Sequence, residues 1–117
     1  VGTAANAEWA TATLERAGLT RQFDVVVTGD QIAHGKPAPD IYLEAARRLG
    51  VAPSACVAIE DSEAGIQSIA AAGMIGILVP HWPPSAAARA AAHTVVPSLH
   101  DASEVISLLL APAGLTH

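Results

Sequence analysis

The sequence lacks several features that would point to particular classes of protein. Its single cysteine, Cys56, excludes a disulfide within the chain, and a cytoplasmic location is therefore the expectation. Six basic residues stand against eleven acidic ones, which argues against a nucleic-acid binder because such proteins need a basic face. No apolar run approaches the roughly 18 residues of a membrane span, so no membrane partner is expected.

Aromatic residues are scarce at 3% of the chain, whereas hydrophobic residues overall reach 51%. We therefore expect an aliphatic core, with alanine at the contacts between helices. Helical periodicity and short β-branched runs alternate along the chain. Helices are predicted over 7–17, 39–49, 62–72 and 85–92 and after a cap at Asp101, and strands over 23–28, 56–59, 75–79 and 94–96. This alternation predicts an α/β fold with a parallel sheet flanked by helices.

The segment after the first predicted strand contains Lys36 between Gly35 and Pro37. In open α/β sheets, ligands bind beyond the carboxyl ends of the strands. Proline restricts the backbone around this lysine, so its ammonium group could serve as a fixed charge for an anion such as phosphate. An ordinary solvated lysine is an equally good interpretation.

Two adjacent acids, Glu60 and Asp61, follow the next predicted strand. A cation would relieve their mutual repulsion, and Mg²⁺ takes few protein carboxylates beside waters and phosphate oxygens. The alternative is that Asp61 or Ser62 only caps the following helix. Gly65 lies in the first turn of that helix, where glycine is unfavourable, and this indicates close backbone approach or a packing contact.

Thr3, followed by Asn6, supplies polar groups near the chain start. The Thr3 hydroxyl could bind a phosphoryl oxygen or cap the helix that begins near Ala7. Taken alone, the residue type favours the cap.

Taken together, Thr3, the run from Gly35 to Asp40 and the run from Ile59 to Ile66 resemble the haloacid dehalogenase-like hydrolases. The similarity is strongest to the phosphoglycolate phosphatase and β-phosphoglucomutase branch, and it extends from about Thr3 to His81. The segments Lys-Pro-x-Pro-Asp and Glu-Asp-Ser-x-x-Gly carry it, each at a strand-to-helix turn. The resemblance implies a Rossmann-like sheet.

The same resemblance implies roles for the residues singled out above. Thr3 would hydrogen-bond the transferring phosphoryl group, and Lys36 would pair with it and with a nucleophilic aspartate. Asp61, assisted by Glu60, would hold Mg²⁺. Thr3, Asn6 and Lys36 would bind the substrate, a small phosphorylated metabolite. The implied activity is phosphate monoester hydrolysis or sugar phosphomutase chemistry through an aspartyl-phosphate.

The chain departs from this family at its first motif. An Asp-x-Asp-x-Thr/Ser element, which carries the nucleophile on a central strand, is absent from the sequence. No segment corresponds to a cap domain. Residues 1–117 are therefore expected to form the C-terminal part of a core domain, with an incomplete sheet that an upstream segment or a second copy completes. The 117 residues alone are expected to be inactive.

Other functions are compatible with parts of the pattern. A non-catalytic module on the same scaffold could bind a phosphorylated ligand or a partner strand. A phospho-acceptor signalling domain would carry its acids early and its lysine late, the reverse of the order here. A nucleotide-binding Rossmann domain is disfavoured because no Gly-x-Gly-x-x-Gly follows a strand.

Overall fold

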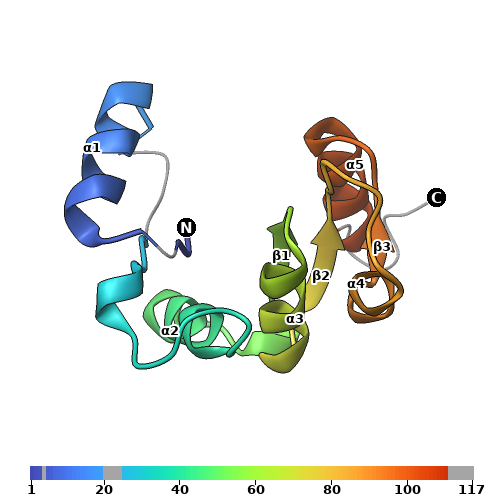
Figure 1. Ribbon diagram of the computed structural model, residues 1–117, viewed down its shortest axis with the longest axis horizontal. Helices are drawn as coiled ribbons and strands as arrows, with labels where there is room; N and C mark the ends of the chain where they lie inside the picture. Colours follow the sequence, from blue (N-terminus) through green and yellow to red (C-terminus); the bar gives the residue numbers. More distant parts are fainter. Residues whose placement is uncertain (4, 20–24, 111–117) are drawn as a thin grey trace.

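The computed structural model describes residues 1–3, 5–19 and 25–110. A parallel sheet with the strand order β1-β2-β3 occupies its second half (Figure 1). Helices connect these strands in the order predicted, which confirms the α/β class. The elements of this half are β1 (Val57–Glu60), α3 (Glu63–Ala71), β2 (Ile75–Leu78), α4 (Ala86–Ala91), β3 (Thr94–Val95) and α5 (Leu99–Leu110).

The first half of the chain is mainly helical. It contains α1 (Ala7–Ala17), the 3₁₀ helix η2 (Gly29–Gln31), α2 (Asp40–Leu49) and the 3₁₀ helix η3 (Pro53–Ala55). Both longer helices end in left-handed glycines, Gly18 with φ 69° and Gly50 with φ 70°. Glycine adopts this conformation without the steric cost of a Cβ, so the predicted helix ends are confirmed.

The strand predicted over 23–28 is reduced to a single bridge in the described residues. Residues 23 and 24 lie outside the described part. Val27 forms one parallel bridge with Gly2, in which Thr3 N donates to Val27 O and Val27 N donates to Val1 O. The prediction was wrong in extent over the described residues, because a strand needs a paired neighbour along its length and the structure gives one bridge here.

The predicted cap of the last helix was also wrong. Helix α5 begins at Leu99, and Ser98 precedes it. The Ser98 hydroxyl oxygen accepts from Asp101 N at 3.1 Å and donates to the Asp101 carboxylate at 2.7 Å. Ser98 and Asp101 thus have the spacing of a capping box, with the acid in the first turn.

The core consists of two clusters, one on each face of the sheet. The larger cluster lies under α2, α3 and α4 and includes Ile66, Ile69 and Leu78. The smaller lies under α5 and includes Ile77. Neighbouring residues of β2 belong to opposite clusters because side chains alternate along a strand. As expected, aliphatic residues dominate both, although Tyr42 joins the larger one.

One edge of β1 has no neighbouring strand within the described residues. On the other edge, Glu60 O accepts from Val79 N at 2.8 Å. In a strand, the N–H and C=O groups of one residue point to the same side, and those of the next residue point to the other side. Val57 and Ile59, which alternate with Glu60 along β1, therefore direct their backbone groups away from β2. The outer edge of β1 therefore offers backbone donors and acceptors to a further strand.

A groove of about 660 Å³, which we call the edge groove, borders this outer edge. Val1 and Gly2 line it together with Val57, Ile59 and Glu60. Because the bonds to Val27 are made by Val1 and Thr3, the intervening Gly2 also directs its backbone groups away from Val27. Within the described residues the groove thus lies between two backbone edges that face each other without a strand between them, and the missing strand expected from the sequence stays a prediction.

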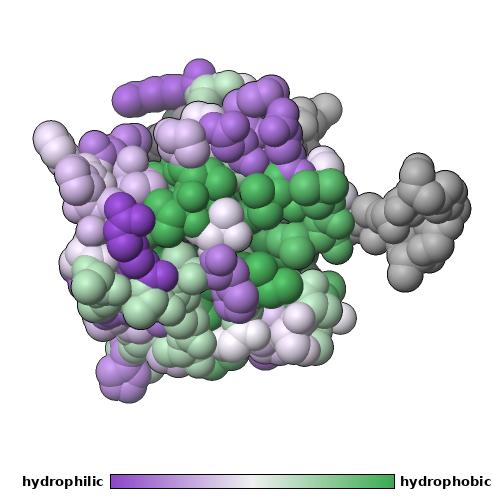
Figure 2. Space-filling model, turned by 90° about the vertical axis from the view of Figure 1, so that its right-hand side faces the viewer, coloured by the Kyte–Doolittle hydropathy of each residue, from purple (hydrophilic) through white to green (hydrophobic). Residues whose placement is uncertain are grey.

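Helix α5 lies at the end of the molecule that Figure 2 turns toward the viewer. Hydrophobic residues gather on that face, and α5 contributes exposed leucines to the surface, namely Leu99, Leu108 and Leu109. Among the helices of the described residues, none combines the length and the apolar character needed to cross a membrane.

A substitution at Gly76 tests the packing of the larger cluster. A Cβ at this position would lie 2.8 Å from Ile66 Cδ1 and 3.1 Å from Ile69 Cγ2, both in fully buried side chains. We expect Gly76→Ala to lower the free energy of unfolding by about 1–3 kcal/mol through overpacking. Denaturant midpoints measure this. Gly35→Ala is the control, because its Cβ would meet no atom within 4 Å; equal stability of the two variants would contradict the packing described.

Candidate functional site

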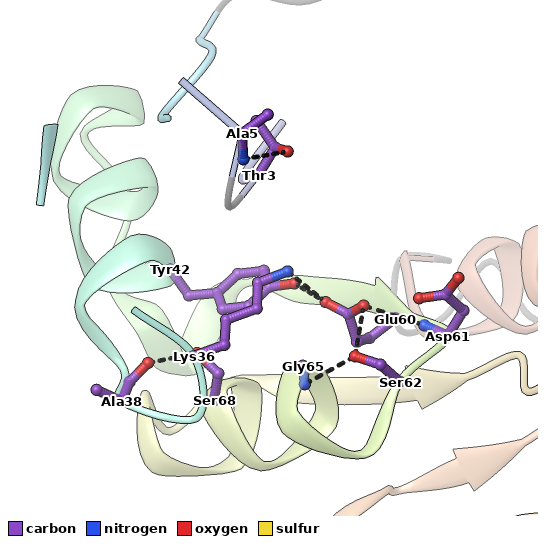
Figure 3. A network of polar contacts seen from close by, with 10 residues as sticks. All are labelled: Thr3, Ala5, Lys36, Ala38, Tyr42, Glu60, Asp61, Ser62, Gly65 and Ser68. Atoms are coloured by element: carbon purple, nitrogen blue, oxygen red, sulfur yellow. Dashed lines mark hydrogen bonds and ion pairs between the residues drawn. The ribbon is translucent and has the colours of Figure 1, made fainter. Parts of the chain in front are cut away.

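An ion pair joins the two motifs at the carboxyl end of β1. Lys36 Nζ lies 2.7 Å from Glu60 Oε2, and the two side chains are only 17% and 9% exposed. Lys36 comes from the loop before α2, and Glu60 is the last residue of β1. The structure thus brings together two of the residues singled out in the sequence (Figure 3).

Tyr42 of α2 also contacts both residues of this pair, a role that the sequence analysis did not predict. Its hydroxyl donates to Glu60 Oε2 at 2.6 Å, and the Lys36 ammonium lies 5.3 Å from the centre of its ring. The ring face attracts the cation while the hydroxyl holds the carboxylate. The signal for Tyr42 was its position six residues after Lys36, on the helix that Lys36 precedes.

The other carboxylate oxygen of Glu60 faces the start of α3. Glu60 Oε1 accepts from Asp61 N at 3.2 Å and from the Ser62 hydroxyl at 3.3 Å. Ser62 Oγ in turn accepts from Gly65 N at 3.0 Å, so the helix cap is Ser62 and not Asp61. Both oxygens of Glu60 are therefore engaged, and its orientation is determined by four donors.

Gly65 lies directly against the Glu60 side chain. A Cβ on Gly65 would fall 1.9 Å from Glu60 Cδ, a distance that no packing arrangement allows. The close backbone approach indicated by a glycine in the first turn is confirmed, and its partner is the carboxylate.

The surroundings of Glu60 have opposing effects on its titration. Burial raises the pKa of the carboxyl, but the hydrogen bonds from Lys36 and Tyr42 outweigh burial, and the pKa lies below its ordinary value. Burial and the hydrogen bond to Glu60 raise the pKa of the Tyr42 hydroxyl. At neutral pH the carboxyl is thus ionised, and the phenol keeps the proton that it donates.

Asp61 is the acid that remains accessible. Its side chain is 59% exposed, and His81 Nε2 lies 3.5 Å from its carboxylate. Glu60 is occupied by its donors, so Asp61 offers the more available oxygens for a ligand. Figure 3 shows the two carboxylates side by side at the end of β1.

Ser68 fixes the loop that carries Lys36. It is fully buried on α3, and its hydroxyl donates to Ala38 O at 2.6 Å. This bond joins α3, which follows the acidic pair, to the segment that follows Lys36. Sequence reasoning missed Ser68; the available signal was a polar residue within the apolar stripe formed by Ile66 and Ile69.

Thr3 and Asn6 lie apart from this network. Thr3 Oγ1 accepts from Ala5 N at 3.2 Å, and Figure 3 shows Thr3 on a separate segment from Lys36 and Glu60. Asn6 Oδ1 accepts from Trp9 N at 2.8 Å and so caps α1. The cap that the sequence suggested for Thr3 thus belongs to Asn6, and the substrate-binding roles of both residues stay predictions.

The donor set suits Mg²⁺ only as part of a larger site. Among the described residues, no group of three or more His, Cys, Asp or Glu side chains converges as a metal cluster would. Mg²⁺ nevertheless binds through one or two carboxylates and completes its shell with waters and substrate phosphates. Asp61 can supply one such carboxylate, with Glu60 beside it.

The ion pair predicts that Lys36→Met lowers the free energy of unfolding by an amount that depends on pH. Because the folded-state pKa of Glu60 is depressed, its contribution to stability is present above the unfolded pKa of about 4.3 and is lost as pH falls through the folded value. Without the cation, burial raises that pKa. We therefore expect the loss in unfolding free energy to grow from pH 4 to pH 7, where it reaches about 3 kcal/mol.

Denaturant unfolding of both proteins with EDTA present measures this difference. The control is Arg89→Met, which removes an exposed cation of α4 that makes no ion pair within the described residues. A loss for Lys36→Met that is the same at both pH values would show that the pair does not depend on the ionised Glu60.

Comparisons with known proteins bear on this geometry. A family model for haloacid dehalogenase-like hydrolases matches residues 1–73. Fructose-1-phosphate phosphatase YqaB of Escherichia coli is 49% identical over 74 residues, which cover 63% of this chain and 39% of that protein. β-Phosphoglucomutase of Bacillus subtilis is 43% identical over 77 residues, which cover 66% of this chain and 34% of that protein.

A solved structure agrees over nearly the whole chain. A haloacid dehalogenase family hydrolase from Deinococcus radiodurans with bound phosphate and sodium superposes with a TM-score of 0.76 at 33% identity. The match covers 94% of this chain and 52% of that one, so the chain spans about half of this neighbour and less of the two curated relatives. Its motifs, its fold and its matched family model agree, and the chain belongs to the haloacid dehalogenase-like hydrolases, a family of enzymes.

Proposed function

We propose that this chain carries most of the active site of a Mg²⁺-dependent phosphoryl-transfer enzyme, a phosphate monoester hydrolase or a sugar phosphomutase. The observation that carries the proposal is the nearly buried Lys36–Glu60 pair with the accessible Asp61 beside it, at the carboxyl edge of the sheet. The family and the single cysteine support a cytoplasmic enzyme.

Lys36 supplies a positioned positive charge. Tyr42, Glu60 and the Ser68-anchored loop hold its ammonium group in place before a substrate arrives. A phosphoryl group that approaches this edge gains a charge-assisted hydrogen bond without further ordering of the side chain.

Asp61, with Glu60 beside it, would hold Mg²⁺, which when bound neutralises negative charge on the phosphoryl group. Thr3 would donate its hydroxyl to a phosphoryl oxygen. Asn6 and Lys36 would join it in binding the substrate. These assignments are what the resemblance to the haloacid dehalogenase-like family implies for the two motifs and the chain start.

The nucleophile would come from outside the 117 residues. An extended segment that carries an aspartate and fills the edge groove would complete the sheet between β1 and Val1–Thr3 and place its carboxylate near Lys36. Residues 1–117 would then be the C-terminal part of a core domain. In the reaction, an aspartate oxygen bonds to phosphorus while the ester P–O bond breaks, and the leaving oxygen takes a proton from a general acid on the same outside segment.

The aspartyl-phosphate then transfers its phosphoryl group to water in a hydrolase or to a sugar hydroxyl in a mutase. The substrate would be a small phosphorylated sugar, because one curated relative is named as a fructose-1-phosphate phosphatase and the other as a β-phosphoglucomutase. A non-catalytic module that binds a phosphorylated ligand would share the binding residues but would show no turnover even with the groove filled.

Substitutions at Asp61 and Lys36 test the active site. In the protein that also carries the groove-filling strand, we expect Asp61→Asn and Lys36→Ala each to lower kcat at least about a hundredfold, the scale for losing one electrostatic stabiliser. Asp61→Asn should also weaken the Mg²⁺ dependence, whereas Lys36→Ala should leave it intact. Glu104→Gln, at an exposed acid of α5, is the control; near-normal rates in both site variants would refute the assignment.

Backbone exchange tests the edge groove. In the 117-residue chain alone, we expect no aryl phosphatase turnover and fast amide exchange at Val57 and Ile59, which slows when the strand is supplied. Ala58 and Glu60 face β2 and serve as protected internal controls. Protection of Val57 and Ile59 in a dimer would identify a second copy as the occupant. Protection in a monomer would show that the sheet closes in another way, contrary to the proposal.

A further inference from the structure

A second cavity adjoins the candidate site but does not share its ion pair. It has a volume of about 430 Å³ and lies between the start of α3, the loop 80–84 and α4. Asp61 lines it, whereas Lys36 and Glu60 do not. The volume falls within the range of small-molecule sites, and the shared Asp61 makes the cavity continuous with the proposed metal and phosphoryl position.

Trp82 on the rim of this cavity is 81% exposed, the largest fraction among the exposed large hydrophobic residues in the described part of the chain. Three prolines in the loop, Pro80, Pro83 and Pro84, restrict the backbone around it. The flat face of the indole therefore stays accessible beside the cavity. An apolar ring surface that covered this face would release ordered water and gain contact area.

Polar groups also line the cavity, beside apolar side chains such as Leu78 and Ala88. Ser85 donates to Glu63 Oε1 at 2.9 Å, and Ser62 and His81 lie along the same cavity. Carboxylate, hydroxyl and imidazole groups can accept from or donate to hydroxyl groups of a ligand. A ligand that suits both parts has a flat apolar face and several hydroxyls, which describes a sugar ring.

We propose that this cavity binds the sugar ring of the phosphorylated substrate, with Trp82 stacked on the ring and the phosphate directed toward Asp61. This inference rests on the proposed function and names the residue that recognises the organic part of the substrate. Trp82 is a specificity-determining residue here, and it takes no part in the transfer of the phosphoryl group.

A comparison of two ligands distinguishes recognition of the sugar ring from recognition of the phosphate. Fructose 1-phosphate and inorganic phosphate are titrated with Mg²⁺ into the protein that also carries the groove-filling strand, with the aspartate of that strand replaced by asparagine to prevent turnover, and their Kd values are measured by calorimetry. We expect Trp82→Ala to weaken fructose 1-phosphate binding about three- to tenfold, the scale of one stacking contact, and to leave the Kd of inorganic phosphate unchanged. Because Trp82 is exposed, we expect this variant to fold as the wild type does, and circular dichroism checks its fold.

Fluorescence supplies a second readout. The chain has two tryptophans, so Trp9→Phe leaves Trp82 as the sole indole, and Trp82→Phe leaves Trp9, which is 63% exposed on α1. We expect fructose 1-phosphate to change the emission of Trp9→Phe but not of Trp82→Phe. Inorganic phosphate should change neither.

The outcomes distinguish this inference from the proposed function. If inorganic phosphate binds through Lys36 but Trp82→Ala leaves the fructose 1-phosphate Kd unchanged, the sugar position is wrong and the proposed function stands. If the wild-type protein binds neither ligand, both the sugar site and the proposed function are refuted. Equal loss of both ligands in Trp82→Ala would show that Trp82 supports the site as a whole, which also overturns its role in sugar recognition.

Discussion

The Lys36–Glu60 ion pair is the interaction on which the candidate site depends. Glu60 accepts hydrogen bonds from the loop before α2, from α2 itself and from the start of α3. Removing one partner of such a pair leaves a charge of low exposure without compensation, which costs more than the pair contributes. The arrangement therefore couples the positions of three segments to one carboxylate, and it explains why glycine is needed at position 65.

Because of this ion pair, the two adjacent acids have different roles. Glu60 is the last residue of β1 and the backbone bends at Asp61, so the two side chains have different surroundings. Glu60 is turned toward Lys36 and Tyr42, while Asp61 stays exposed. One acid thus organises the cation, and the other is available to a ligand at the edge of the sheet.

Sequence reasoning predicted much of the fold and the main elements of the site, for identifiable physical reasons. Hydrophobic periodicity located the helices and strands of the second half, where local packing agrees with local preference. It overestimated the strand around Val27, because strand length depends on a neighbour that the pattern does not reveal. It also missed the roles of Tyr42 and Ser68, since both are set by contacts with distant segments.

The edge groove is where the proposed further strand would meet the candidate site. Val57 and Ile59 offer backbone groups on one side, and Gly2 offers its own on the other, so the groove has the pattern of a missing parallel strand. Lys36, Tyr42 and Glu60 line this groove as well. A strand that satisfied both edges would thereby bring its own side chains to the ion pair, so in the proposed enzyme the same strand would complete both the sheet and the active site.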